Sequence, residues 1–419
     1  MPTLAFGAIA DDITGASDLA NTLVRGGLPT VLAIGVPEAE EMEAGAVVIA
    51  LKTRTIRPED AVSQSLAAWR WLAKRRTNAV MLKYCSTFDS TPQGNIGPVA
   101  DAVLDASGGK LSVVCPAFPT NKRTVYKGRL FVGDVPLDES TMRDHPLTPM
   151  RDASLVRLMA AQTSHKVGLI AWEIVAQGRD ALAAALDSAR ADGVRHVVVD
   201  AITDADLRVI AEAAWRRAML TGGSGIAIGV PALCREHGGK GASPAFPQIV
   251  GSAFIVAGSC SAATTAQVSA FQAAGGAAYQ IDPLQLAAGG EAVDGASAWV
   301  RDRLGERPIL VYSTARPDVL RDVQAQLGQE RAAALVEDAL ARITAEAVKA
   351  GARRLVVAGG ETSGAVMQAL GVRLLRIGPE IDPGVPWTAT LDSKPLALAL
   401  KSGNFGGPDF FTRAFEMLP

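Results

Sequence analysis

Short apolar runs alternate with longer amphipathic segments along the first half of the chain. The apolar runs have the length of strands and cover residues 4–10, 30–34, 47–51, 80–83 and 111–114. Segments such as 16–24, 59–74 and 96–104 instead repeat apolar residues at the spacing of one helix face. This alternation is typical of βαβ units and predicts an α/β fold built on a mostly parallel sheet flanked by helices.

The same alternation resumes in the second half of the chain, after a break in composition. Residues 236–247 are rich in Gly, Ser, Pro and Lys, whereas apolar strand-length runs return at 253–257, 355–358 and 396–400. A chain of 419 residues is also too long for one ordinary core. We therefore expect an N-terminal domain over 1–235, a linker over 236–250 and a C-terminal domain over 251–419.

Residues 355–370 read as a buried strand, a tight polar turn and a short helix. Gly359 and Gly360 permit positive φ and a close approach by a ligand, and Thr362 or Ser363 is expected to cap the helix. Amide groups at a helix N-terminus bind phosphate well. Two alternatives stay open: an ordinary strand-to-helix turn, or a turn in which the Glu361 carboxylate satisfies the helix dipole or holds water around a magnesium ion.

Two further small-residue turns follow strand-length runs in the same domain. They lie at 258–261 and 401–407, and together with the turn at 359–363 they strengthen the interpretation as a nucleotide phosphate site. A Gly-x-x-x-x-Gly-Lys-Ser/Thr loop is absent from the sequence, which excludes a Walker-type site. A Gly-x-Gly-x-x-Gly after the first strand is absent as well, which argues against an ordinary dinucleotide-binding domain.

In the first half, polar side chains follow several predicted strands. Ligands of parallel sheets bind at the carboxyl ends of the strands, so we expect these side chains to meet at one edge. The residues concerned are Asp11, Asp12, Arg54, Arg57, Lys83, Ser86 and Thr87. Each also has an ordinary interpretation, such as a helix cap, an ion pair or a solvated loop charge.

The chemistry of this predicted edge fits a small acid that carries hydroxyl groups. Cations suit a carboxylate, and hydroxyls with an aspartate suit a polyol. An aspartate can also accept a proton from a substrate hydroxyl, and we place Asp12 first and Asp11 second as that base. The glycine turn at 221–225, with Ser224, either contacts substrate or phosphate or only lets the backbone pass closely. His145 could contact the substrate, although a loop histidine is more often simply exposed. Residues 125–132 are expected to form a hairpin or an excursion from the sheet.

Composition excludes several classes of partner and site. Acidic residues (43) nearly balance basic ones (41), so no overall field favours nucleic acid. The cysteines Cys85, Cys115, Cys234 and Cys260 are scattered, which predicts reduced thiols and neither disulfides nor a zinc site. Because neither a signal peptide nor a bilayer-spanning run is evident, we expect a cytoplasmic protein without a membrane partner. A homo-oligomer stays open, and the ligands of any metal are unknown from the sequence.

Taken together, these segments resemble the four-carbon acid sugar kinase family, and the resemblance runs along nearly the whole chain. The matching segments are 10–18, 94–98, 221–225, 358–364 and 401–406. Residues 83–91 look like the branch that acts on 3-oxo-tetronates, although many relatives carry Asp where this chain has Cys85.

The resemblance implies a kinase that transfers the γ-phosphate of ATP to the 4-hydroxyl of a 3-oxo-tetronate, a 3-dehydro-erythronate or its threonate isomer. It implies a substrate domain followed by a nucleotide domain, with Mg²⁺ and an active site in the interdomain cleft. The resemblance does not settle the catalytic base; our own assignment keeps Asp12 first and Asp11 second. In the same assignment, Arg54, Arg57 and Lys83 hold the carboxylate or neutralise phosphate charge, beside Ser86, Thr87 and Ser224. By their positions in the matching motifs, the residues expected to contact ATP are Gly258, Ser259, Gly360, Glu361, Thr362, Ser363 and Gly403.

Two other classes of protein compete with the kinase. One is a non-catalytic two-domain sensor of sugar acids, which would bind the acid tightly and bind no ATP. The other is an NAD-dependent sugar-acid dehydrogenase, which a nicotinamide absorbance assay would detect.

Overall fold

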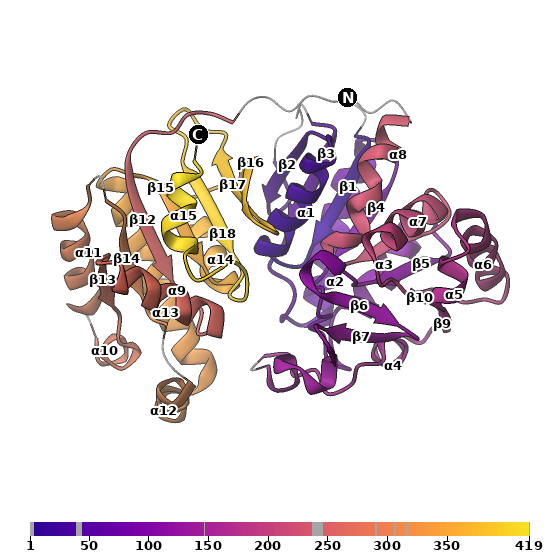
Figure 1. The fold of residues 1–419 in the computed structure, drawn as a ribbon, viewed down its shortest axis with the longest axis horizontal. Helices are drawn as coiled ribbons and strands as arrows, with labels where there is room; N and C mark the ends of the chain where they lie inside the picture. The colour runs from indigo at the N-terminus through magenta and orange to yellow at the C-terminus, as the bar shows by residue number, and fades with distance from the viewer. Residues whose placement is uncertain are drawn as a thin grey trace. The chain divides into compact units, whose positions relative to one another are not determined.

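The computed structural model describes residues 4–38, 44–145, 147–236, 246–289, 291–305, 307–314 and 317–418. Its internal contacts divide the chain into two compact units, residues 1–244 and 245–419. Figure 1 draws the first in indigo to pink and the second in brown to yellow. Residues 237–245 of the expected linker lie outside the described residues. Both units are α/β, as the alternation of apolar runs predicts.

The first unit is built on a parallel sheet in the order β2-β3-β1-β4-β11-β5-β10-β9. Its strands are β1 (Phe6–Ala10), β2 (Thr30–Ile34), β3 (Ala46–Ala50), β4 (Val80–Lys83), β5 (Ser112–Cys115), β9 (Val167–Ile170), β10 (His196–Val199) and β11 (Met219–Gly222). Strands β1 and β3 are buried throughout, because parallel sheets are covered on both faces. This is why these strands read as continuous apolar runs.

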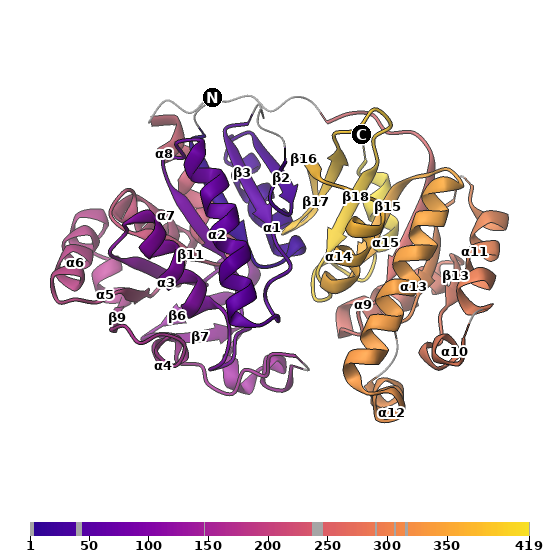
Figure 2. The same cartoon turned by 180° about the vertical axis from the view of Figure 1, so that it is seen from behind.

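Helices cover both faces of this sheet. Figure 1 shows α1 and α7 on the near face, and Figure 2 shows α2 and α3 on the other. The helical segments are α1 (Ile13–Arg25), α2 (Pro58–Lys74), α3 (Ile96–Ser107), α4 (Leu155–Ala160), α5 (Trp172–Val175), α6 (Arg179–Ala191), α7 (Asp204–Ala214), α8 (Val230–Glu236) and the 3₁₀ turns η1 (Pro119–Asn121), η2 (Leu137–Glu139), η3 (Thr141–Asp144) and η4 (Ser224–Gly229).

A small antiparallel sheet leaves the main sheet of the first unit. It contains β6 (Arg123–Tyr126), β7 (Arg129–Val132) and β8 (Val135–Pro136), so the expectation of a hairpin over 125–132 is confirmed. Lys127 and Gly128 both have positive φ, which suits the twist of a two-residue hairpin turn. The Asp200 carboxylate accepts hydrogen bonds from both of their amides, at 2.6 and 2.8 Å, and so holds this turn in place.

The second unit has a mixed sheet in the order β13-β14-β12-β15-β18-β17-β16. The first five strands are parallel, whereas β17 is antiparallel to its neighbours β18 and β16. The elements are β12 (Ser252–Ala257), β13 (Ala277–Gln280), β14 (Ile309–Tyr312), β15 (Ala352–Ala358), β16 (Leu374–Asp382), β17 (Val385–Thr390), β18 (Ala397–Lys401), α9 (Ala262–Ala273), α10 (Pro283–Ala288), α11 (Glu291–Arg303), α12 (Pro317–Leu327), α13 (Gln329–Lys349), α14 (Gly360–Ala369) and α15 (Phe410–Glu416).

The core of the second unit is centred on fully buried aromatic side chains. Trp387, Phe410 and Phe411 pack with aliphatic residues of β12, β15 and β18. The Trp387 indole also donates a hydrogen bond of 2.8 Å to the carbonyl of Ala414. This packing holds the strand ends that carry the glycine turns. Among the described residues, every helix is too short or too polar to cross a lipid bilayer.

Candidate functional site

Two aspartates follow β1 directly and lie at the carboxyl end of the first unit's sheet. Asp12 is the N-cap of α1: its carboxylate accepts a hydrogen bond from the amide of Gly15 at 3.1 Å and from the hydroxyl of Thr14 at 2.6 Å. A capping aspartate is favoured there because it satisfies a free amide and the positive end of the helix dipole. The capping interpretation of Asp12 is therefore correct, whatever else the residue does.

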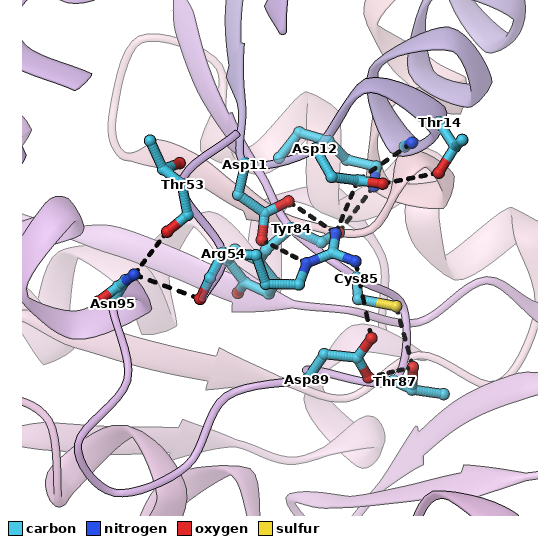
Figure 3. A network of polar contacts seen from close by, with 12 residues as sticks. Asp11, Asp12, Thr14, Thr53, Arg54, Tyr84, Cys85, Thr87, Asp89 and Asn95 are labelled. Carbon is cyan, nitrogen blue, oxygen red and sulfur yellow. Dashed lines mark hydrogen bonds and ion pairs between the residues drawn. The ribbon is translucent and has the colours of Figure 1, made fainter. Parts of the chain in front are cut away.

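Arg54, in the turn after β3, joins the two aspartates (Figure 3). Its guanidinium donates to both oxygens of Asp11, from Nε at 2.9 Å and from Nη2 at 2.7 Å. Nη2 also donates to Asp12 Oδ1 at 2.7 Å. The side chains of Arg54 and of the two aspartates remain about one-fifth exposed, 21% and 20%, so a small ligand can reach the cluster.

The two carboxylates have opposite electrostatic environments. Burial raises the pKa of Asp11 above its ordinary value, and the attraction of Arg54 only partly offsets this. Burial also acts to raise the pKa of Asp12, but the nearby cations of Arg54 and Lys83 outweigh it, and the pKa is lowered. Asp11 is therefore the stronger proton acceptor of the pair.

Lys83 ends β4 beside these aspartates and is almost completely buried. Its ammonium donates a hydrogen bond of 2.8 Å to the carbonyl of Tyr84. A Cβ atom at position 15 would lie 2.7 Å from Lys83 Nζ and 2.4 Å from Asp12 Oδ1. Gly15 thus leaves open the space that the Lys83 ammonium and the Asp12 carboxylate occupy.

The segment after β4 contributes a further carboxylate, Asp89, which the sequence analysis did not single out. Asp89 accepts a hydrogen bond of 2.7 Å from the hydroxyl of Thr87, and its carboxylate lies 3.7 Å from Arg54 Nη1. The thiol of Cys85 lies 3.0 Å from the same hydroxyl. Burial, together with the charge of Asp89, raises the pKa of Cys85 to about 12, so this thiol stays neutral. The sequence signal that could have pointed to Asp89 is its position within segment 83–91, which resembles one branch of the family.

Asn95, from the matching segment 94–98, supports the turn that carries Arg54. Its side-chain amide donates to the carbonyl of Thr53 at 2.6 Å and to the carbonyl of Ile56 at 3.0 Å (Figure 3 shows the first). A cavity of about 40 Å³ lies next to it, and its wall includes Asp11, Arg54, Lys83, Asp89 and Asn95. This volume has room for water but not for a ligand of several carbon atoms.

Two of the expected substrate residues lie at neighbouring strand ends of the same sheet. A Cβ atom at Gly223, after β11, would lie 3.3 Å from the Cβ of Ser86, after β4, so the two segments adjoin. Ser224 follows directly, and its buried hydroxyl has no hydrogen-bond partner among the described residues. An unsatisfied buried hydroxyl at a strand end is consistent with a polar ligand that is bound there.

Arg57 is not part of the cluster around Arg54. Its guanidinium pairs with Asp60 at 2.9 Å, and 77% of its side chain is exposed. His145, by contrast, is half-buried and lies within the electrostatic reach of Asp89 and Arg54, so its interpretation as an ordinary exposed loop residue is wrong. Burial lowers the pKa of His145, and its Nδ1 accepts a hydrogen bond of 3.1 Å from the amide of Thr148.

In the second unit, the three glycine turns follow three adjacent parallel strands at the same level. Ala257 at the end of β12 pairs with Ala358 at the end of β15, and Ala358 pairs with Lys401 at the end of β18. The amide of Gly258 donates to the carbonyl of Ala358 at 3.0 Å, and the amide of Gly359 donates to the carbonyl of Lys401 at 2.8 Å. The turns are therefore in direct contact.

Small hydroxyl side chains fill the space between these turns. A Cβ atom at Gly403 would lie 2.3 Å from Ser259 Oγ, and one at Gly258 would lie 2.3 Å from Thr362 Oγ1. Ser261, the N-cap of α9, donates its hydroxyl to the carbonyl of Gly403 at 2.6 Å. The glycines thus permit the backbone and hydroxyl groups of the three turns to approach one another closely.

Helix α14 begins earlier than the sequence predicts. Its N-cap is Gly359, with φ of 134°, and it makes no side-chain capping hydrogen bond. The expectation that Thr362 or Ser363 caps the helix is wrong: both lie in its first turn, and the Ser363 hydroxyl donates to the carbonyl of Gly359 at 2.7 Å. Glycine takes the cap position because other residues rarely adopt this φ. The first-turn amides are left without a side-chain cap.

Lys401 was missed as an individual residue, although it opens the matching segment 401–406. It is fully buried, and its ammonium donates to Thr264 Oγ1 at 3.1 Å and to the carbonyls of Ser402 and Gly403 at 3.0 Å each. Burial lowers the pKa of Lys401 to about 7. The Lys401 side chain thus connects α9 to the third glycine turn. It also places a titratable charge at the junction, the place where the three glycine turns meet.

The described residues contain no group of three or more His, Cys, Asp or Glu side chains arranged to hold a metal ion. Mg²⁺ in phosphate sites keeps several waters and takes one or two carboxylates besides the phosphates. Glu361, in the first turn of α14 among the glycine turns, is a carboxylate suited to that arrangement. A single nearby carboxylate therefore fits a magnesium ion that is bound mainly by phosphates and water better than a metal ion held by the protein alone.

Comparison with known proteins decides the family. A model of a sugar-binding N-terminal domain matches residues 6–230, and a model of a nucleotide-binding C-terminal domain matches residues 254–411. The chain belongs to the four-carbon acid sugar kinase family. It is 54% identical to the 3-oxo-tetronate kinase of Burkholderia multivorans, over 98% of this chain and 97% of the relative. It is 53% identical to that of Cupriavidus necator, over 98% and 96%.

Solved structures of this family share the fold. A Salmonella typhimurium LT2 protein, which carries the provisional description of a tRNA synthase, has a TM-score of 0.85 at 41% identity and 99% coverage of both chains. A Haemophilus influenzae protein has a TM-score of 0.77 at 42% identity, over 99% of this chain and 100% of that one.

Proposed function

We propose that this family member transfers the γ-phosphoryl group of ATP to the 4-hydroxyl of a 3-oxo-tetronate, which gives 3-oxo-tetronate 4-phosphate and ADP. The observation that carries the proposal is the contact between three glycine turns at the ends of β12, β15 and β18. A sensor of sugar acids needs no such junction. The full-length relatives named 3-oxo-tetronate kinase support the choice of acid.

The acid is proposed to bind at the cluster in the first unit. Arg54 and Lys83 supply positive charge for its carboxylate, which suits the planar fork of the guanidinium. Ser86, Thr87 and Ser224 supply hydroxyls for the polyol part, and the unsatisfied Ser224 hydroxyl supports this assignment. Arg57 is left out of the proposed site because it is exposed and paired with Asp60. The small cavity implies that the acid binds on the exposed side of Arg54 or displaces one of its partners.

The proton of the 4-hydroxyl is proposed to pass to Asp11, with Asp12 as the alternative. A general base works best when its pKa is close to the working pH, and the raised pKa of Asp11 favours it over Asp12. Asp12 is already engaged by Thr14 and Gly15 as the cap of α1. In this arrangement, Asp12 orients Arg54 and the start of the helix while Asp11 accepts the proton.

The triphosphate is proposed to bind at the glycine turns of the second unit. The amides of Gly360, Glu361 and Thr362 begin α14 without a side-chain cap, and such amides bind phosphate well. The Ser363 amide already donates to the carbonyl of Gly359 at 2.8 Å, so Ser363 is proposed to line the site rather than to supply an amide. Gly258, Ser259 and Gly403 complete this phosphate site from the two adjacent strands. When bound, Mg²⁺ supplies charge neutralisation for the phosphates, and Glu361 would hold it through water.

Acid and nucleotide are thus assigned to different units, so transfer requires each unit to present its substrate to the other. Phosphoryl transfer depends on such alignment and on charge neutralisation more than on covalent help from the protein. Closure around both substrates would also exclude water, which is the competing phosphate acceptor. We also propose a cytoplasmic location, which would give the enzyme access to ATP.

The proposal is tested by mixing the purified chain with ATP, Mg²⁺ and a panel of four-carbon acids while ADP release is measured. We expect release with one or both 3-oxo-tetronates and a phosphorylated product with the mass of the 4-phosphate. Tight binding of an acid without ATP binding would favour a sensor. Nicotinamide turnover with the same acids would favour a dehydrogenase. Either result, without ADP release, contradicts the kinase.

A further inference from the structure

A cavity of about 450 Å³ lies at the opposite edge of the first unit's sheet from the aspartate cluster. It lies at the starts of the adjacent strands β1, β4, β11 and β5, where Phe6, Val80, Met219 and Leu111 line it. The cluster of Asp11, Arg54 and Lys83 lies at the other ends of these strands. The volume falls within the range of small-ligand sites. The cavity is therefore separate from the proposed acid site and large enough for an organic ligand.

The lining of this cavity is positively charged. It includes Arg76, Lys110, Arg216 and Arg217, and neither Asp nor Glu is among its lining residues. Arg217 approaches Asp187 only to 3.8 Å. Of the described residues, none forms an ion pair or hydrogen bond with the side chains of Arg76, Lys110 or Arg216. Because the whole chain has a net charge of −2, this concentration of positive charge is local.

Apolar and aromatic side chains form the rest of the wall. Trp69, on α2, and Trp215, at the end of α7, both line the cavity, as do Val103 and Leu104 of α3. Trp215 is almost completely buried, which gives it a fixed position. Flat indole surfaces beside guanidinium groups favour a ligand with a flat apolar body and an anionic head.

Two of the arginines occupy an unfavourable backbone conformation. Arg76 has φ of 51° and Arg216 has φ of 61°, and each lies in the turn just before a strand that borders the cavity. Glycine or asparagine adopts this region more readily than a long side chain does. Arginine at both positions, where glycine or asparagine would be less strained, makes these two side chains the first candidates for a ligand contact.

We propose that this cavity binds a small organic anion with a flat apolar body, such as an aromatic carboxylate or sulfonate. The head would pair with Arg76 and Arg216, and the body would lie against Trp69 and Trp215. The inference rests on the cavity, its charge and its strained arginines, and it is independent of the proposed kinase activity.

The test titrates the full-length chain with 1-anilinonaphthalene-8-sulfonate and follows probe fluorescence. We expect saturable binding of one probe per chain. In the double variant Arg76→Asn, Arg216→Asn, the dissociation constant should rise about tenfold or more, because two charge-assisted contacts are lost. Asparagine tolerates positive φ, so the turns keep their conformation. The double lysine variant at the same positions should retain most of the affinity.

A matched control removes two positive charges elsewhere, by Arg151→Asn and Arg179→Asn, both of which are exposed residues of the same unit. This control should bind the probe as the unaltered chain does. Unchanged affinity in the double variant at 76 and 216, or an equal loss in the control, overturns the proposal. A crystal soaked with the probe should show the naphthalene ring against Trp69 and Trp215, and ring density elsewhere alone would also overturn it.

Discussion

Arg54 donates two parallel hydrogen bonds to Asp11, from Nε to Oδ2 at 2.9 Å and from Nη2 to Oδ1 at 2.7 Å. The same Nη2 reaches Asp12 at 2.7 Å, so one guanidinium orients both carboxylates that follow β1. A lysine carries the charge but lacks the planar fork. The geometry of the aspartate pair therefore depends on arginine at this position.

Arg54→Lys is expected to lower kcat/KM for the acid by about ten- to a hundredfold, which corresponds to the loss of one or two charged hydrogen bonds. The nucleotide dissociation constant should not change, because its proposed site lies in the other unit. Steady-state ADP release and calorimetry with an ATP analogue measure the two effects. The matched control is Arg157→Lys, in an exposed fork with Asp152, and this variant should be fully active. An active Arg54→Lys variant would contradict this role.

Asp11→Asn and Asp12→Asn are expected to act differently. Asp11→Asn should lower kcat by about a hundredfold and remove the acidic limb of the pH–kcat profile, since general bases contribute about this much. Asp12→Asn keeps a residue that can cap α1 but loses the charge that holds Arg54, so it should mainly raise KM for the acid. Retention of the acidic limb in Asp11→Asn together with its loss in Asp12→Asn would reassign the base to Asp12.

Gly403→Ala is expected to weaken ATP binding by about tenfold or more, because the new methyl group would lie 2.3 Å from Ser259 Oγ and push this hydroxyl out of the junction. Affinity for the acid should be retained. Gly295→Ala provides the control in the same unit, since its nearest neighbour is Tyr279 Oη at 3.6 Å. Equal ATP affinity in the two variants would remove the third glycine turn from the proposed nucleotide site.

The buried Lys401 predicts a pH dependence of nucleotide binding. Its pKa is about 7, so raising the pH from 6 to 8 removes one proton and one positive charge from the junction of the turns. ATP affinity of the unaltered chain should therefore fall over this range relative to that of Lys401→Met. The variant serves as the control for the titration of ATP itself, which affects both proteins equally. A constant affinity ratio across this range would show that the Lys401 charge does not act on the nucleotide.

The stability of the fold should depend on the same group with the opposite sign. An unfolded lysine keeps its proton up to about its ordinary pKa of 10.5, whereas Lys401 loses its proton at about 7. Between these values the unfolded chain binds more protons, so the free energy of unfolding rises with pH. Lys401→Met should lack this component, which denaturant unfolding of both proteins between pH 6 and pH 9 would measure. Parallel pH dependences would contradict the low pKa.

Much of the fold followed from local patterns. The strand before Asp11, the hairpin at 125–132 and the glycine turns were all readable, because apolar periodicity and glycine act over a few neighbouring residues. The start of α14 was misplaced for the same reason: Thr362 and Ser363 are good caps by type, but the backbone at Gly359 decided where the helix begins. His145 was misjudged because its burial depends on residues far away in sequence.

The sequence by itself determined the α/β class, the two-part organisation and the presence of polar residues and glycines at strand ends. Only the tertiary structure decided which of these residues meet. Arg54 lies 43 residues from Asp11, and Thr264 lies 139 residues from Gly403, yet each pair is hydrogen-bonded. Arg57 has the same charge as Arg54 and lies three positions later, but it faces solvent. Strand order and helix packing decide which of these side chains lie together and which face solvent. Both arise from contacts that no local pattern encodes.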